Sequence, residues 1–78
     1  TADNMRQLGK HGAVEVVVRS LQLYPYTTEN RGLIEVALML VRRLAMDQYN
    51  RRRLARQQAP QVVCHVMRES RADGKLQE

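Results

Sequence analysis

The stretch NRRRLARQQAPQVVCHVM, residues 50–67, repeats the apolar pattern of NMRQLGKHGAVEVVVRSL, residues 4–21, at a constant spacing of 46 residues. Apolar residues occupy the same places in both copies, while the positions between them change freely. The matched pairs are Leu8 and Leu54, Ala13 and Ala59, Val16 and Val62, Val17 and Val63, Val18 and Cys64, and Leu21 and Met67. Such a pattern indicates a repeated structural unit, and a period of this length is typical of helical solenoids.

We expect the first copy to fold as two helices. Asp3 is suited to cap a short first helix, and Gly9 or Gly12 to end it. In the second helix one apolar face recurs at i, i+3, i+4 and i+7, formed by Val14, Val17, Val18 and Leu21. The β-branched residues of this segment would also suit a strand. A helix is favoured because the second copy has Pro60 where a first helical turn would lie.

A third helix is expected after the break at YPYTT, residues 24–28. Pro25 cannot continue a helix interior, and Thr27 or Thr28 can cap the helix that follows. One broad side of this helix is apolar: Leu33, Ile34, Ala37, Leu40, Val41 and Leu44. The other side carries Arg31, Gly32, Glu35, Met39, Arg42, Arg43 and Met46. An apolar arc this broad needs neighbours on two sides, as in the middle of a stack.

A short helix, a second helix and a longer third helix in one repeat resemble the armadillo repeat. The residues that carry the resemblance are N-x-x-x-L-x-x-x-G-A-V-x-x-V-V from Asn4 and IEVALMLVRRLA from Ile34. It implies an all-α, right-handed α-solenoid segment, with one full three-helix repeat and part of a second. The first repeat would span 1–46, with helices at about 3–11, 13–23 and 29–46. The second would span 47–78, with helices at about 48–57 and 59–70, then a loop and the start of a third helix at about 74–78.

In armadillo proteins the third helices line a groove that binds extended peptides or partner proteins. The resemblance therefore implies a partner-binding face made of Glu35, Met39, Arg42, Arg43 and Met46. Members that bind basic localisation signals often use an Asn near the end of this helix and a Trp one turn earlier. Here those positions carry Arg43 and Met39, so the face would repel a basic peptide. It would suit an acidic or mixed acidic–apolar segment, with Glu35 setting the register by repelling acidic residues.

The arginine run Arg51 to Arg53 raises a different hypothesis, a basic helical module that binds nucleic acid. The chain has 13 Lys+Arg against 8 Asp+Glu, a formal charge of +5, which favours acidic partners in general. Platforms for single-stranded nucleic acid usually interleave basic residues with exposed aromatic rings, and only Tyr49 lies nearby. We therefore expect the run to form a solvated outer surface, with Asp47 placed one helical turn before Arg51 for a weak ion pair.

Catalytic and metal-binding residues are not grouped in this sequence. His11 and His65 fall on different expected helices, and Cys64 matches Val18, which predicts a small buried side chain. Adjacent positions on a helix point about 100° apart, so Cys64 and His65 do not form a nucleophile–base pair. We expect no enzymatic activity, no metal and no cofactor.

The expected partner is therefore a protein or peptide, acidic in character, with nucleic acid as the alternative. No apolar run approaches the roughly 20 residues that span a bilayer, so no membrane partner is expected. A single cysteine fits a reduced setting, the cytoplasm or the nucleus. A solenoid unit buries its apolar faces only against its neighbours, so we expect the isolated chain to leave apolar side chains open and to self-associate. The faces concerned lie on Val14–Leu21, on Leu33–Leu44, and on Val62, Val63, Val66 and Met67.

Overall fold

The computed structural model describes the backbone of residues 2–77 and the side chains of residues 3–72. All regular elements in this range are helices, which confirms the all-α class; the AVEVVVRS segment is helical and not a strand. The helices are α1 (Ala2–Lys10), α2 (Ala13–Leu23), α3 (Arg31–Leu44), α4 (Gln48–Arg56) and α5 (Ala59–Gln77). They form an elongated body of 42 × 20 × 18 Å.

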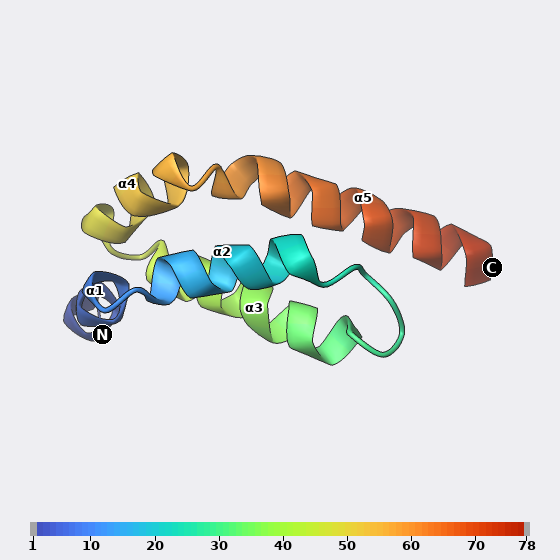
Figure 1. Cartoon of the computed structure of the whole chain (residues 1–78), viewed down its shortest axis with the longest axis horizontal. Helices are drawn as coiled ribbons and strands as arrows, with labels where there is room; N and C mark the ends of the chain where they lie inside the picture. Colours follow the sequence, from blue (N-terminus) through green and yellow to red (C-terminus); the bar gives the residue numbers. More distant parts are fainter. Residues whose placement is uncertain (1, 78) are drawn as a thin grey trace.

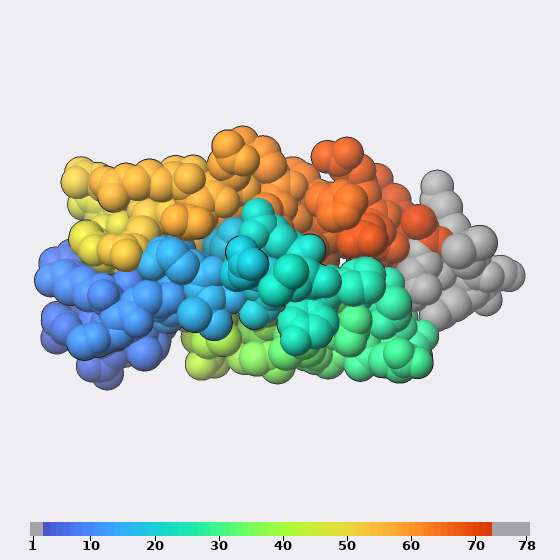
Figure 2. Space-filling view, viewed as in Figure 1, coloured from blue at the N-terminus to red at the C-terminus, as the bar shows by residue number. Residues whose placement is uncertain are grey.

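Helix α2 lies in the middle of the molecule, between α3 and α5 (Figures 1 and 2). Helices α2 and α5 run in the same direction, and α3 runs opposite to both (Figure 1). The short helices α1 and α4 pack against each other at one end. Both α3 and α5 pack against α2 but scarcely touch each other, which leaves a trough between them. Residues of α3 and α5 that face each other across this trough form one of the two candidate surfaces described below.

The core is aliphatic and is centred on the inner face of α2. Ile34 and Leu44 of α3 and Val66 of α5 are buried against it, each with about 1% of its surface exposed. The other buried apolar residues are Val14, Val17, Val18, Leu21, Ala37, Leu54 and Ala59. Tyr26, in the connection before α3, packs on the edge of this core, and the Arg31 guanidinium lies 5.8 Å from its ring centroid.

The backbone turns between α1 and α2 and between α4 and α5 are built alike. Gly12 has a left-handed φ of 94°, and Gln58, which occupies the matching place in the second copy, has a φ of 59°. The amide of Gly12 donates to the Gly9 carbonyl at 3.1 Å, and the amide of Gln58 donates to the Ala55 carbonyl at 3.0 Å. The sequence repeat is therefore matched by a repeated backbone geometry at the entry to the second helix of each copy.

Two helix starts differ from the expected capping. Because α1 already begins at Ala2, Asp3 lies in its first turn and is not the N-cap. Helix α3 begins at Arg31, two residues later than expected. The hydroxyl of Thr27 accepts a hydrogen bond from the Asn30 amide at 3.2 Å, so Thr27 orders the turn before the helix without being its N-cap residue.

The largest difference from expectation is at the end of the chain. A loop was expected after residue 70, followed by a new helix at 74–78, but α5 continues without interruption to Gln77. Residues 68–73 contain no proline and no β-branched side chain to oppose helix formation. A single glycine inside a helix costs only about 1 kcal/mol, so Gly74 does not end it. Glu78, the last residue of the expected new helix, lies outside the described residues.

Candidate partner-binding surface

The outward side of α3 carries most of the expected binding residues. Met39, Arg42, Arg43 and Met46 line a shallow surface hollow of about 350 Å³. They come together because positions three, four and seven apart share one side of a helix. Met46 is 65% exposed, both arginines are exposed, and Met39 is half-buried. We call these four residues the α3 outer face.

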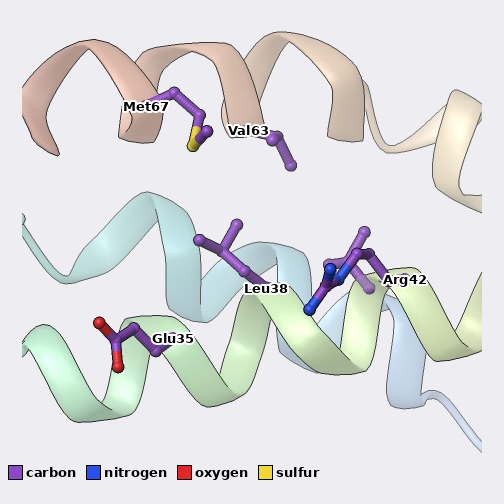
Figure 3. A pocket seen from close by; sticks show the side chains of 6 residues that line it. Glu35, Leu38, Arg42, Val63 and Met67 are labelled. Carbon is purple, nitrogen blue, oxygen red and sulfur yellow. The ribbon is translucent and has the colours of Figure 1, made fainter. Parts of the chain in front are cut away.

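Glu35, the fifth expected residue, belongs to a different surface. It lines a hollow of about 360 Å³ in the trough between α3 and α5, together with Leu38, Val41, Arg42, Val63 and Met67. In Figure 3, Val63 and Met67 of α5 point toward α3, while Glu35 and Arg42 lie at opposite ends of the α3 wall. The structure thus divides the expected site: only Arg42 takes part in both hollows.

Sequence reasoning missed a third hollow, of about 480 Å³, which continues the trough toward α4. Its lining is almost entirely apolar: Val41, Ala45, Arg51, Leu54, Ala55, Ala59, Pro60, Val63 and Cys64. Val41 and Val63 line both this hollow and the one beside Glu35, so the two are continuous. We call the pair the α3–α5 groove. The signal that could have found it is the breadth of the apolar side of the expected third helix, because its edge residues Val41 and Ala45 are only partly buried against the core and line this hollow.

The burial of the matched repeat positions also corrects the expected open faces. Val14 to Leu21 were expected to be partly open, and Val16 is indeed 66% exposed, but the inner-face residues Val14, Val17, Val18 and Leu21 are buried because α3 and α5 both pack against α2. Val66 is buried for the same reason, whereas Met67 is 54% exposed beside the groove. On α3, the expected open surface is present at Leu33 and Val36, which are about half exposed.

The arginine run does not form a uniform solvated surface. Arg53 is half-buried and its Nε lies 2.9 Å from Oε2 of Glu15, which ties α4 to α2. Its Nη1 also donates to the Tyr49 hydroxyl at 2.6 Å. The hydrogen bond to Glu15 raises the pKa of the Arg53 guanidinium above its ordinary value. Arg51 donates to the Ala45 carbonyl at 2.9 Å, and only Arg52 is left as a fully solvent-directed member of the run.

Asp47 has a structural role that differs from the expected pairing with Arg51. It is the N-cap of α4 and accepts a hydrogen bond from the Asn50 amide at 3.1 Å. Its other oxygen lies 2.8 Å from Nε of Arg6 on α1. Burial raises the pKa of the Asp47 carboxyl, but the Asn50 amide and the Arg6 guanidinium outweigh this effect, so the pKa lies below its ordinary value.

Cys64 is exposed, contrary to the burial expected from its match with Val18. Val18 is covered by neighbouring helices, whereas the corresponding side of α5 has no helix over it. His65 is also exposed, and its Nε2 lies 3.4 Å from Oε1 of Glu69, one helical turn later. Among the residues that the structure describes, no three His, Cys, Asp or Glu side chains are placed to hold a metal ion.

Compared with models of protein families, with curated protein sequences and with solved structures, the chain matches none of them. None of the helices in the described range is long and apolar enough to cross a membrane. The geometry of the two surfaces is therefore the basis for assigning a function.

Proposed function

We propose that this chain is a non-catalytic protein-binding segment of armadillo-like type that presents the α3 outer face to an acidic or mixed acidic–apolar partner. The observation that carries the proposal is that two exposed arginines of α3 have no partner among the described side chains. Arg42 and Arg43 are exposed and make no hydrogen bond or ion pair with any described side chain, and they flank a hollow lined by two methionines. Cations without internal partners beside adaptable thioether side chains suit a contact surface.

The contrast with the other arginines supports this assignment. Arg6 and Arg53 are each paired with a carboxylate of another helix, so they serve the fold. Arg42 and Arg43 contribute nothing of this kind, and their charge remains available to a partner. Two adjacent cations raise the local positive potential, which attracts carboxylates and repels a basic segment.

The repeated turn at Gly12 and Gln58 supports the armadillo-like part of the proposal. Helices α1, α2 and α3 have 9, 11 and 14 residues, and the second copy again starts with a helix of 9 residues, α4, although its second helix, α5, is longer than α2. In an array of such units α3 would be one of the helices that line a common surface. Protein binding on that surface would then be the expected use of its exposed side chains.

The proposal is tested with an extended acidic peptide of Asp, Glu and Leu, and with the same peptide carrying Lys in place of the acids. Arg43→Glu should weaken binding of the acidic peptide about tenfold or more, as expected for loss and reversal of a contact charge. The matched control is Arg19→Glu, which makes the same charge change on an exposed position of α2 that lines none of the three hollows. Circular dichroism should be unchanged in both variants. Equal binding by wild type and Arg43→Glu, or a loss of helicity comparable to that of a core variant, would contradict the assignment.

Nucleic-acid binding is the competing function, and the contacts of the arginine run argue against it. Arg53 is held by Glu15, and the Tyr49 ring lies 5.8 Å from both Lys10 and Arg53, which cover it rather than leaving it free to stack on a base. Titration of labelled RNA and DNA at two salt concentrations distinguishes the classes. Binding through phosphates falls with a slope of about 0.7–0.9 in log K per contact against log salt. Tight binding with that slope, removed by Arg51→Ser and Arg52→Ser together, would replace the protein-binding proposal.

A further inference from the structure

Two guanidinium groups border one hollow on the outer side of α3. Arg42 and Arg43 both line the hollow of about 350 Å³, with Met39 before them and Met46 after them in the chain. Adjacent residues of a helix project about 100° apart, so the two arginine side chains reach this hollow from different sides. Among the residues that the structure describes, no carboxylate lines it. Its walls therefore offer two cationic groups and two thioether groups.

The acidic residues that precede and follow this part of α3 do not neutralise the hollow. Asp47 is buried, and its carboxylate accepts from the Asn50 amide and holds the Arg6 guanidinium. Glu35 lies at the other end of the α3 wall, about two helical turns before Arg42, and is not paired with it among the described side chains (Figure 3). The electrostatic potential over the hollow is therefore positive, and it attracts an anion of a partner.

We propose that the α3 outer face binds a phosphorylated serine or threonine of its partner protein, with an apolar residue on each side of the phosphorylated one. This inference rests on the proposed protein-binding function and names the chemistry of the partner at that same site. The phosphate lies between the guanidinium groups of Arg42 and Arg43, and the apolar side chains of the partner pack on Met39 and Met46.

The pair of arginines favours a phosphate monoester over a carboxylate. A carboxylate has two oxygens in one plane, which a single guanidinium can satisfy with two parallel hydrogen bonds. A phosphate monoester has three terminal oxygens and a charge of about −1.5 to −2 at pH 7, so it can accept from two guanidinium groups at once. Arg42 and Arg43 are both exposed, and both are available to it. The second arginine therefore adds more to phosphate binding than to carboxylate binding.

The methionines favour a protein segment as the carrier of the phosphate. Met39 and Met46 are seven residues apart, about 10 Å along α3, with the arginines between them. In an extended segment, residues i, i+2 and i+4 point to the same face and span about 13 Å, a length that flexible methionine side chains can match. Because the hollow is shallow, the backbone groups of such a segment keep their hydrogen bonds to water.

RNA and DNA fit this hollow less well than a phosphoprotein. Each phosphodiester carries one charge, and single-stranded nucleic acid is bound by several cations together with aromatic rings on which its bases stack. No aromatic ring lines the hollow within the part of the chain that the structure describes. The thioether groups of Met39 and Met46 suit aliphatic side chains instead.

The probes are three short fluorescent peptides that differ only at the central position, which is phosphoserine, glutamate or serine. Each peptide has leucine two residues before and two residues after this position, and neutral polar residues elsewhere. Binding to the wild-type chain is followed by fluorescence anisotropy at constant ionic strength. We expect the phosphoserine peptide to bind about tenfold or more tightly than the glutamate peptide, and the serine peptide to bind most weakly.

The variants test whether both arginines hold the phosphate. Arg42→Gln and Arg43→Gln should each weaken phosphoserine binding about tenfold or more, and should reduce the preference over glutamate to about twofold or less. Arg19→Gln, the same change at an exposed position of α2 outside this hollow, should leave the preference unchanged. Circular dichroism checks that each variant keeps its helicity.

A pH series on the wild-type chain gives a second measurement that needs no variant. The preference for phosphoserine should fall as the pH is lowered from about 7.5 to about 5, because the phosphate monoester loses its second charge near pH 6. Glutamate keeps its charge over most of this range, since its ordinary pKa is about 4.3. A preference that does not change with pH would contradict recognition of the doubly charged phosphate.

Other outcomes overturn the inference and are distinguishable from failure of the proposed function. Equal binding of the phosphoserine and glutamate peptides, both weakened by Arg43→Glu, would contradict the phosphate assignment and leave the proposed function standing. Failure of these peptides and of the acidic Asp, Glu and Leu peptide to bind would contradict both. A phosphoserine preference that survives both glutamine variants would place the phosphate away from the α3 outer face.

Three further ligands test the source of the phosphate: inorganic phosphate, a single-stranded RNA, and vesicles of phosphatidylcholine with phosphatidylinositol phosphate. Each is used as a competitor of the phosphoserine peptide. We expect none of them to displace it at an equal concentration of phosphate groups. Displacement by any one of them, lost in Arg42→Gln and Arg43→Gln, would assign the hollow to that ligand and would overturn a phosphoprotein partner.

Discussion

The side-chain amide of Asn50 donates a hydrogen bond to the backbone carbonyl of Met5, 2.6 Å away, across 45 residues of sequence. Asn50 is fully buried, and its backbone amide is bonded to the N-cap Asp47, which in turn holds Arg6. These contacts fix α4 on α1, where the second copy of the repeat meets the first. The joint between the copies is thus polar and specific, unlike the aliphatic core beside it.

This joint predicts a dependence of stability on pH. The pKa of Asp47 in the folded chain lies below its ordinary value of 3.8, so the unfolded chain binds the proton more readily. The stabilising contribution is therefore complete above about pH 4 and is lost as the pH falls through the folded pKa. Asp47→Asn should lower the melting temperature at neutral pH. It should also make the melting temperature decrease less steeply as the pH is lowered into the acid range. Asp3→Asn, at an exposed carboxyl of α1, is the control and should retain the wild-type acid dependence of the melting curve.

Gly9 is the place where α1 approaches Asn50 most closely. A Cβ at this position would overlap the Asn50 side chain, which its hydrogen bond to the Met5 carbonyl holds in place. Gly9→Ala should therefore destabilise the chain by about 1–3 kcal/mol in urea unfolding, although alanine is the better helix former. Gly32→Ala, where a Cβ meets no atom, should instead stabilise by up to about 1 kcal/mol. Stabilisation by both changes would show that Asn50 does not hold this position.

Gln58 has a left-handed backbone where the first copy has Gly12. A non-glycine residue in this conformation is strained, and glycine removes the strain. Gln58→Gly should stabilise the chain by about 0.5–1 kcal/mol, measured by thermal or urea unfolding. Gln57→Gly, at a neighbouring residue with a φ of −84°, should stabilise nothing. Similar effects at the two positions would mean that backbone strain is not the cause.

Leu8 and Leu54 occupy matching places in the two copies but differ in burial, 45% against 6% exposed. Leu54→Ala should cost about 2–5 kcal/mol because it leaves a cavity between α4 and its neighbours. Leu8→Ala should cost less than about 1 kcal/mol, since this side chain already faces solvent. Urea unfolding of the two variants gives both values. Equal losses would show that Leu8 is covered in solution, as it would be by self-association, and measurements at two protein concentrations would reveal this.

The sequence alone determined the helical class and the position of most elements. Spacing of apolar residues at helical intervals, Pro25, Gly12 and Pro60 are local signals, and helices depend chiefly on local signals and on which face is apolar. The match of NMRQL with NRRRL also indicated a repeated unit, and the common turn at Gly12 and Gln58 has the same geometry in both copies. The continuation of α5 to Gln77 was not predicted, because the armadillo pattern places a loop and a new helix after the second helix, whereas residues 68–73 have no proline or β-branched residue and Gly74 has only a small helical cost.

The tertiary structure decided which side chains are covered and which are paired. Cys64 and Val18 match in sequence, yet one is exposed and the other buried, because burial depends on whether a second helix lies over that face. In the sequence Arg53 cannot be told from its neighbours Arg51 and Arg52. The fold brings it into a hydrogen bond with Glu15, which lies 38 residues earlier. The tertiary structure likewise decides that Glu35 and Met39 line different hollows, and that α3 and α5 form a groove between them. These are relations between helices that are distant in sequence, and a pattern within one helix carries no information about the distance to the next.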